Sequence, residues 1–185
     1  MAMKAGPQEL EPFYGKTRGF SFLKEVQPIL DKKCISCHKG EMWTPGYKSP
    51  DDKNSFSLLK RSVIETKSGR KWSESYLNLL RVKGAETYTA KSHELIHWIS
   101  PQSGPEMMKP YFFGAVKSPM LSMLKKGHNR VKLSVEEYNK LACWIDLAVP
   151  FCGDYTEANN WSDKEKKWYQ RQVKKQKRLE GLERQ

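Results

Sequence analysis

Cys34-Ile35-Ser36-Cys37-His38 is the stretch that decides what this chain folds around. Its C-x-x-C-H spacing is the attachment pattern for a c-type haem, in which two thiols bond the porphyrin and the adjacent histidine binds the iron. The chain has only 4 cysteines and 4 histidines in 185 residues, so a chance pentad is rare. The pentad predicts one covalent haem c, with Cys34 and Cys37 as anchors and His38 as the proximal ligand of the iron.

Two other interpretations of the close cysteine pair compete with haem attachment. A thioredoxin-like redox pair belongs in a βαβ context, whereas residues 20–33 have the pattern of a helix. A structural zinc site needs two further ligands, usually a second close pair. Cys143 and Cys152 are too far apart for such a pair, and His93 and His97 have helical spacing far from either cysteine.

Length and composition favour one domain, or one domain with an extension. Hydrophobic residues make up 38% of the chain and charged residues 29%, so the apolar core is modest and a porphyrin would help to fill it. No apolar run reaches the length of a transmembrane helix.

The N-terminus lacks the apolar stretch of a secretory signal peptide, since Met1-Ala2-Met3-Lys4 leads into Gly, Pro and charged residues. Haem c attachment in bacteria ordinarily takes place outside the cytoplasm. We therefore expect the chain to be a segment of a longer exported protein with other domains, located in the periplasm or another extracytoplasmic compartment.

Much of the net charge of +12 is concentrated near the C-terminus, where nine Lys or Arg residues stand against three Glu residues between Lys164 and Arg184. A solvated helix face accounts for such a run. The alternative is a docking surface for an acidic partner, such as a redox protein. No nucleic-acid-binding signature accompanies the charge, so nucleic acid is not expected as a partner.

Apolar periodicity and capping signals predict a mostly helical chain with long loops and very little strand. An irregular segment spans 1–19, the haem domain spans 20–155 and a basic helix lies within 156–185. Two helices are expected in the first half of the chain: 22–33, capped by Ser21 and bent at Pro28, and a short one after Ser73. A third spans 119–126, between Ser118-Pro119 and Gly127. Two more begin at capping boxes: one runs from Ser134/Glu137 to Pro150, and the other from Ser162/Glu165 to about 182. Long loops are expected over 39–71, with a short turn at 56–59, and over 81–116.

An electron-transfer haem usually has a second axial ligand, either His or Met. His128 is the favoured candidate, because it follows Gly127 just past a helix end and lies six residues before the next cap, where a loop side chain can enter a pocket. Several other residues remain open as ligands: His93, His97 and the pair Met107-Met108. Met120 and Met123 lie on an apolar helical stripe, so core packing is the first interpretation of both.

Cys143 and Cys152 are nine residues apart, one within the late helix and one beyond it. A disulfide between them would pin the loop that follows the helix in an oxidising compartment. Two unpaired thiols are the alternative, and we favour the disulfide by a small margin.

Several segments resemble a known family. Val26-Gln27-Pro28-Ile29-Leu30 before the pentad resembles class I cytochrome c domains of planctomycete-type multidomain proteins. The closer resemblance is to the haem domain of proteins related to the hydrazine synthase alpha subunit, over roughly residues 20–170. It is carried by Ser118-Pro119-Met120-Leu121, Gly127-His128, Val131-Lys132-Leu133-Ser134, Trp144-Ile145-Asp146-Leu147, Pro150, Cys152-Gly153-Asp154-Tyr155 and Glu157-Ala158-Asn159.

The resemblance implies a class I-like fold, in which an early and a late helix cross and the haem lies in the cleft between them. Ordinary members carry a Met-Pro ligand before the Leu-Ser cap of the late helix, whereas His128 and no methionine occupies that stretch here. The resemblance thus supports His/His ligation. The hydrazine-forming enzyme recruits a tyrosine four residues after the motif histidine, and because Met42 stands there, that activity is not expected.

The first hypothesis for function is therefore an electron-transfer domain with one haem rather than an enzyme. The alternative is a haem enzyme or a small-ligand sensor with an open distal site, within a larger exported protein. A third hypothesis is a structural haem that completes a small core.

Overall fold

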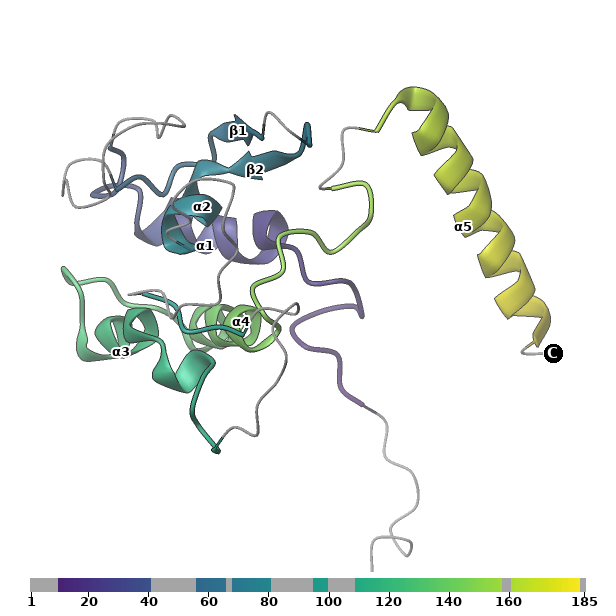
Figure 1. Cartoon of the computed structure of the whole chain (residues 1–185). Helices are drawn as coiled ribbons and strands as arrows, with labels where there is room; N and C mark the ends of the chain where they lie inside the picture. The colour runs from purple at the N-terminus through teal and green to yellow at the C-terminus, as the bar shows by residue number, and fades with distance from the viewer. Residues whose placement is uncertain are drawn as a thin grey trace, which may run out of the picture.

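Five α-helices and one short hairpin form most of the regular structure in the computed structural model, which describes residues 10–40, 56–65, 68–80, 95–99, 109–157 and 161–183. The helices are α1 (Gln27–Lys33), α2 (Glu74–Leu80), α3 (Pro119–Lys126), α4 (Val135–Asp146) and α5 (Asp163–Glu183). A π-helical turn, η2 (Phe22–Val26), precedes α1, and a 3₁₀ turn, η3 (Ala115–Lys117), precedes α3. The prediction of a mostly helical chain is confirmed (Figure 1).

The first predicted helix is present, but it changes type where Pro28 enters it. The amide of Gln27 bonds the carbonyl of Phe22, five residues earlier, and the α-helical pattern begins only at Gln27. Proline has no amide hydrogen and its ring crowds the preceding turn, so Pro28 is best tolerated in the first turn of a helix. The sequence predicted a bend at Pro28, and the structure has the wider π turn η2 just before the helix that contains this proline.

An aromatic cluster forms the centre of the core and joins the early helical run to the late helix. The ring centres of Phe22 and Trp144 lie 5.2 Å apart, which packs η2 against α4. Tyr76 of α2 meets Phe22 at 5.1 Å and Phe151 at 4.9 Å. Trp144 and Phe22 are fully buried. Phe151, which lies in the segment beyond α4, joins the same aromatic cluster and so brings that segment onto the core.

A two-stranded antiparallel hairpin, β1 (Ser62–Ile64) and β2 (Lys71–Ser73), lies in the stretch expected to be loop. Val63 pairs with Trp72, and the Trp72 ring stacks on Tyr76 at 5.6 Å. The hairpin leads directly into α2, where the Ser73 hydroxyl accepts a hydrogen bond from the amide of Tyr76. The predicted cap at Ser73 is confirmed, whereas the strands were missed because three residues are too short to show an alternating pattern.

The capping signals around α3 and α4 locate the starts of both helices correctly. Pro119 begins α3 and Gly127 follows its last residue. The Ser118 side chain is not the cap that we predicted, because its hydroxyl donates to the carbonyl of Gly114 and accepts from the amide of His97. The predicted capping box of Ser134 with Glu137 is present at the start of α4.

Helix α4 ends at Asp146, four residues before the predicted end at Pro150. The amide of Ala148 bonds the carbonyl of Ile145, and the amide of Val149 bonds that of Trp144. This is the Schellman arrangement, which needs a left-handed residue just past the helix and usually takes glycine there. Ala148 supplies it with φ of 62°, so the stop carries no glycine signal in the sequence.

Helix α5 stands apart from the other helices, as Figure 1 shows at one side of the molecule. The predicted capping box is present, since the Ser162 amide bonds the Glu165 carboxylate and the Glu165 amide bonds the Ser162 hydroxyl. None of the 21 residues of α5 is buried. Within the described ranges, the chain forms no helix whose length and apolarity would suit a bilayer crossing.

Candidate haem-binding site

The pentad Cys34–His38 follows the last residue of α1 and forms a series of tight turns. The amide of Cys34 bonds the carbonyl of Leu30 at 2.8 Å, and the amide of His38 bonds that of Cys34 at 3.0 Å. Cys34, Cys37 and His38 consequently line one cavity, while Ile35 packs against the core. The spacing thus brings both thiols and the histidine to one wall, as the C-x-x-C-H pattern predicts.

The cavity has a volume of about 260 Å³ and lies between α1, α3 and the middle of α4. Its walls are predominantly apolar, which suits the face of a porphyrin and excludes water from it. The apolar lining residues are Ile29, Leu30, Phe56, Leu58, Leu79, Leu95, Met120, Met123, Leu124, Val131, Leu133 and Leu141.

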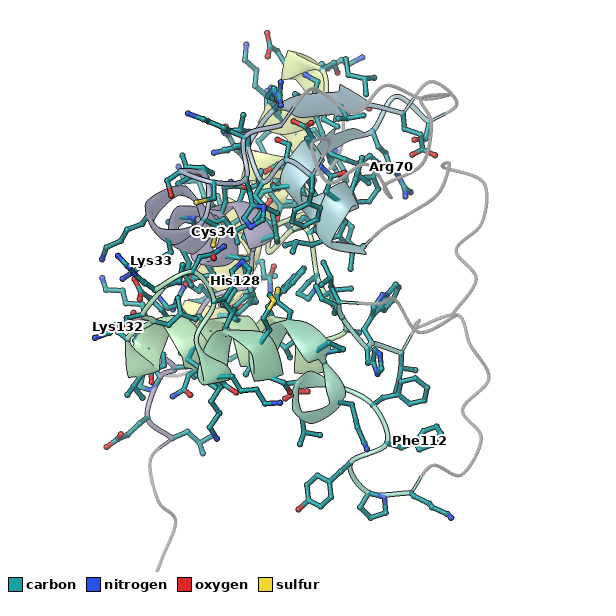
Figure 2. The ribbon with its side chains drawn as sticks, turned by 90° about the vertical axis from the view of Figure 1, so that its left-hand side faces the viewer. Lys33, Cys34, Arg70, Phe112, His128 and Lys132 are labelled. Atoms are coloured by element: carbon teal, nitrogen blue, oxygen red, sulfur yellow. The ribbon has the colours of Figure 1, made fainter. Side chains whose placement is uncertain are left out.

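His128 reaches the cavity from a two-residue turn between α3 and α4. His128 and Val131 form an isolated antiparallel bridge, closed by a 2.8 Å hydrogen bond from the Val131 amide to the His128 carbonyl. Asn129 and Arg130 form the turn with φ of 45° and 63°. A left-handed pair is the signature of a type I′ turn, which ordinarily takes Asn and Gly. The turn fixes the backbone of His128 opposite the pentad (Figure 2).

The rings of His38 and His128 lie 5.9 Å apart between centres, with an angle of 11° between their planes. A metal ion bound by an imidazole nitrogen lies about 2.0–2.1 Å from it, so two imidazoles on opposite sides of one ion have ring centres about 6 Å apart. The observed separation therefore fits a pair of axial ligands. The two thiols and the apolar walls around the same cavity fit the rest of a haem c.

Burial affects the chemistry of both the histidine and the first thiol. Burial lowers the pKa of His38, and the nearby His128 lowers it further. The imidazole is thus held neutral, which is the form that binds a metal. Burial raises the pKa of Cys34 to about 11, and Cys37 contributes to the rise. Cys34 is accordingly a protonated thiol, whereas Cys37 is exposed at the cavity edge.

The other predicted ligand candidates divide into three groups. His97 is half-buried and does not line the cavity; its amide bonds the Ser118 hydroxyl beside α3. Met120 and Met123 both line the cavity; Met120 belongs to the buried core, as the sequence favoured, whereas Met123 is 36% exposed. His93 and the pair Met107-Met108 lie outside the described residues.

Cys143 and Cys152 are both free thiols, which overturns the predicted disulfide. Cys143 lies within α4, whereas Cys152 follows the left-handed residues Ala148 and Val149 beyond the helix. Burial raises the pKa of Cys143, and Asp146 raises it further, which favours the protonated thiol.

Among the described residues, no group of three or more His, Cys, Asp or Glu side chains could hold a metal ion. A zinc site made of protein ligands alone would need such a group. Cys34, Cys37, His38 and His128 line different parts of one apolar cavity and form no such cluster.

A buried chain of hydrogen bonds fixes the segment after the pentad, and sequence reasoning missed it. The His38 carbonyl accepts from the amide of Leu58, and the Leu58 carbonyl accepts from the Gln27 side chain at 3.1 Å. The Ser75 hydroxyl in turn donates to the Gln27 side chain. Phe56 meets the His38 ring edge-on at 5.2 Å. A glutamine two helical turns before the motif, Gln27, was the local signal of this network.

Comparison of the chain with protein-family models, curated proteins and solved structures gives no match. The resemblance to class I cytochrome c domains therefore stays a prediction from the sequence motifs.

Proposed function

We propose that this chain is a c-type cytochrome domain that carries one covalent haem and transfers electrons. The observation that carries the proposal is the pairing of His38 and His128, whose parallel rings are 5.9 Å apart across a cavity that Cys34 and Cys37 also line. The proposal includes the class I-like arrangement, since an early helical run and a late helix meet through Phe22 and Trp144.

Each group of residues has a defined task in this function. Cys34 and Cys37 would hold a haem covalently through their two sulfur atoms. His38 and His128 would hold its iron through imidazole nitrogens. The apolar walls exclude water. When bound, the haem iron supplies the one-electron chemistry by changing between ferric and ferrous states.

Two imidazoles favour a lower reduction potential than a His/Met pair does, because methionine ligation raises the potential. A haem enzyme or ligand sensor would need a distal position open to substrate. His128 lines the cavity with its ring 5.9 Å from that of His38 and is the candidate for that position, which supports the electron carrier over an enzyme or a sensor.

The partners and location follow from the same proposal. Covalent haem attachment implies an extracytoplasmic compartment, with this chain as one part of a longer exported protein. The basic residues of α5 form a charged surface that suits an acidic redox partner, because complementary fields speed encounter.

Optical spectra of the protein produced with the haem-attachment machinery test the proposal. We expect low-spin bands in the ferric and ferrous states, haem that stays attached after denaturation, and little binding of carbon monoxide. His128→Ala should become high-spin or take up a thioether signature from Met120 or Met123, while the control His97→Ala should match the wild-type protein. Absence of covalent haem would refute the proposal, and a wild-type protein that binds carbon monoxide readily would favour the enzyme or sensor.

A further inference from the structure

Lys33 links the two walls of the cavity. It is the last residue of α1 and immediately precedes Cys34, so its backbone belongs to the pentad wall. Its ammonium group donates a 2.8 Å hydrogen bond to the carbonyl of Lys132, 99 residues away on the opposite wall. Figure 2 shows Lys33 and Lys132 together at the edge where Cys34 and His128 also lie.

The second partner of Lys33 is Glu137, which belongs to the capping box at the start of α4. The Lys33 ammonium lies 3.6 Å from the Glu137 carboxylate, which also accepts a 2.7 Å hydrogen bond from the Ser134 amide. The Lys33 side chain is 24% exposed and its stem lines the cavity. The Lys33 ammonium thus has one exposed hydrogen bond to a backbone carbonyl and one ion pair, and both partners belong to the segment around the start of α4.

The segment that Lys33 holds is the segment that positions His128. Arg130 lies in the left-handed region with φ of 63°, where a residue with a side chain is disfavoured. Such a turn persists only when the surrounding structure holds its ends. Val131 closes the turn, and Lys132 follows it, so the bond from Lys33 restrains the chain one residue beyond the closure.

We propose that Lys33 is a positioning residue that holds the His128 turn in place across the cavity. The ligand role of His128 rests on the proposed function, whereas the restraint on the turn is a property of the polypeptide itself. Lys33 acts through the Lys132 carbonyl and the Glu137 cap, and it touches neither imidazole in this role. Its loss would let the turn open and His128 leave its place opposite His38.

Lys32 provides a matched control for this role. It precedes Lys33 on the same helix and reaches the same Glu137 carboxylate at 3.5 Å, but its side chain is 70% exposed. Lys32→Met and Lys33→Met therefore remove one charge each from the same neighbourhood. Only Lys33→Met removes the bond to Lys132, and methionine keeps an unbranched stem against the cavity.

Hydrogen exchange of the purified full chain tests the restraint on the turn, because its readout is a backbone amide and not the haem. The amide of Val131 reports opening of the turn, and the amide of Leu141 in the middle of α4 reports global unfolding. We expect Lys33→Met to speed exchange at Val131 about tenfold relative to Leu141, the factor that one charged hydrogen bond supports. Lys32→Met should leave this ratio unchanged, and Lys33→Arg should restore most of it. Equal ratios in wild type and Lys33→Met, or equal effects of both methionine variants, would overturn the proposal.

Carbon monoxide binding to the ferrous haem protein tests the ligand part. Carbon monoxide must displace His128, so its association should be about tenfold faster in Lys33→Met and unchanged in Lys32→Met. Unchanged association in Lys33→Met would overturn the role of Lys33 in ligand positioning. Failure of the wild-type chain to attach haem would refute the proposed function instead, and the exchange experiment would still decide whether Lys33 holds the turn.

Discussion

The backbones of Gly19 and Gly153 pass each other so closely that neither residue has room for a side chain. A Cβ atom on Gly153 would lie 2.5 Å from the carbonyl oxygen of Gly19, a separation that real Cβ atoms do not adopt. This crossing brings the irregular N-terminal segment against the loop that follows α4. It lies next to the 3.0 Å hydrogen bond from the Phe22 amide to the Phe151 carbonyl, so the contact also seats η2 on that loop.

Gly153→Ala should therefore lower the free energy of unfolding by about 1–3 kcal/mol, the usual cost of forcing atoms into a packed contact. Denaturant unfolding followed by near-UV circular dichroism would measure the change. Gly181→Ala is the control, because a Cβ there meets no atom within 4 Å and the residue lies in α5. An unchanged denaturation midpoint for Gly153→Ala would show that the two backbones can move apart without a loss of stability.

Ala148→Gly should stabilise the protein by about 1 kcal/mol, because Ala148 occupies a left-handed position that glycine adopts without steric cost. Ala142→Gly, inside α4, should destabilise it by a similar amount, because glycine weakens a helix interior. The two substitutions are chemically identical but fall on different backbone conformations, left-handed at Ala148 and α-helical at Ala142. Thermal unfolding should move in opposite directions for them, and a loss of stability in both would contradict the Schellman stop.

Glu25 should make the stability of the protein depend on acid pH. The Arg18 hydrogen bond lowers the pKa of this buried carboxyl, burial opposes the shift, and Lys140 adds to the lowering. A carboxyl whose pKa is lower in the native state than its ordinary value of 4.5 stabilises the fold above that value. The contribution is lost as the pH falls through the native pKa.

Glu25→Gln tests this dependence. The variant should be less stable than wild type at pH 7, and the difference in unfolding free energy should shrink as the pH falls below about 4.5. Urea unfolding between pH 7 and pH 3 measures it. A difference of the same size at every pH would show that glutamine loses packing rather than charge.

Features encoded by a few neighbouring residues could be predicted from the sequence. The pentad, the Ser134/Glu137 box and the Pro119 start of α3 are local signals, and the structure bears out the two helix starts. The placement of Cys34, Cys37, His38 and His128 around one cavity also agrees with the prediction from spacing and loop position.

Features that depend on distant contacts could not be predicted. The bond from Lys33 to Lys132 spans 99 residues, and no periodicity within either segment indicates it. The end of α4 depends on Ala148, a residue with no turn preference of its own. Met123 was assigned to the core because a helical stripe shows which residues are apolar but not whether they face a filled interior or a cavity.

The lack of buried residues in α5 has a consequence for how the protein unfolds. A 21-residue helix that buries no side chain shares little free energy with the core, so its formation depends mainly on its own propensity and caps. Two-state cooperativity then fails for the chain as a whole. On heating, the far-UV signal of α5 should decline gradually, while the near-UV signal of the cluster around Trp144 is lost later, in one sharp transition.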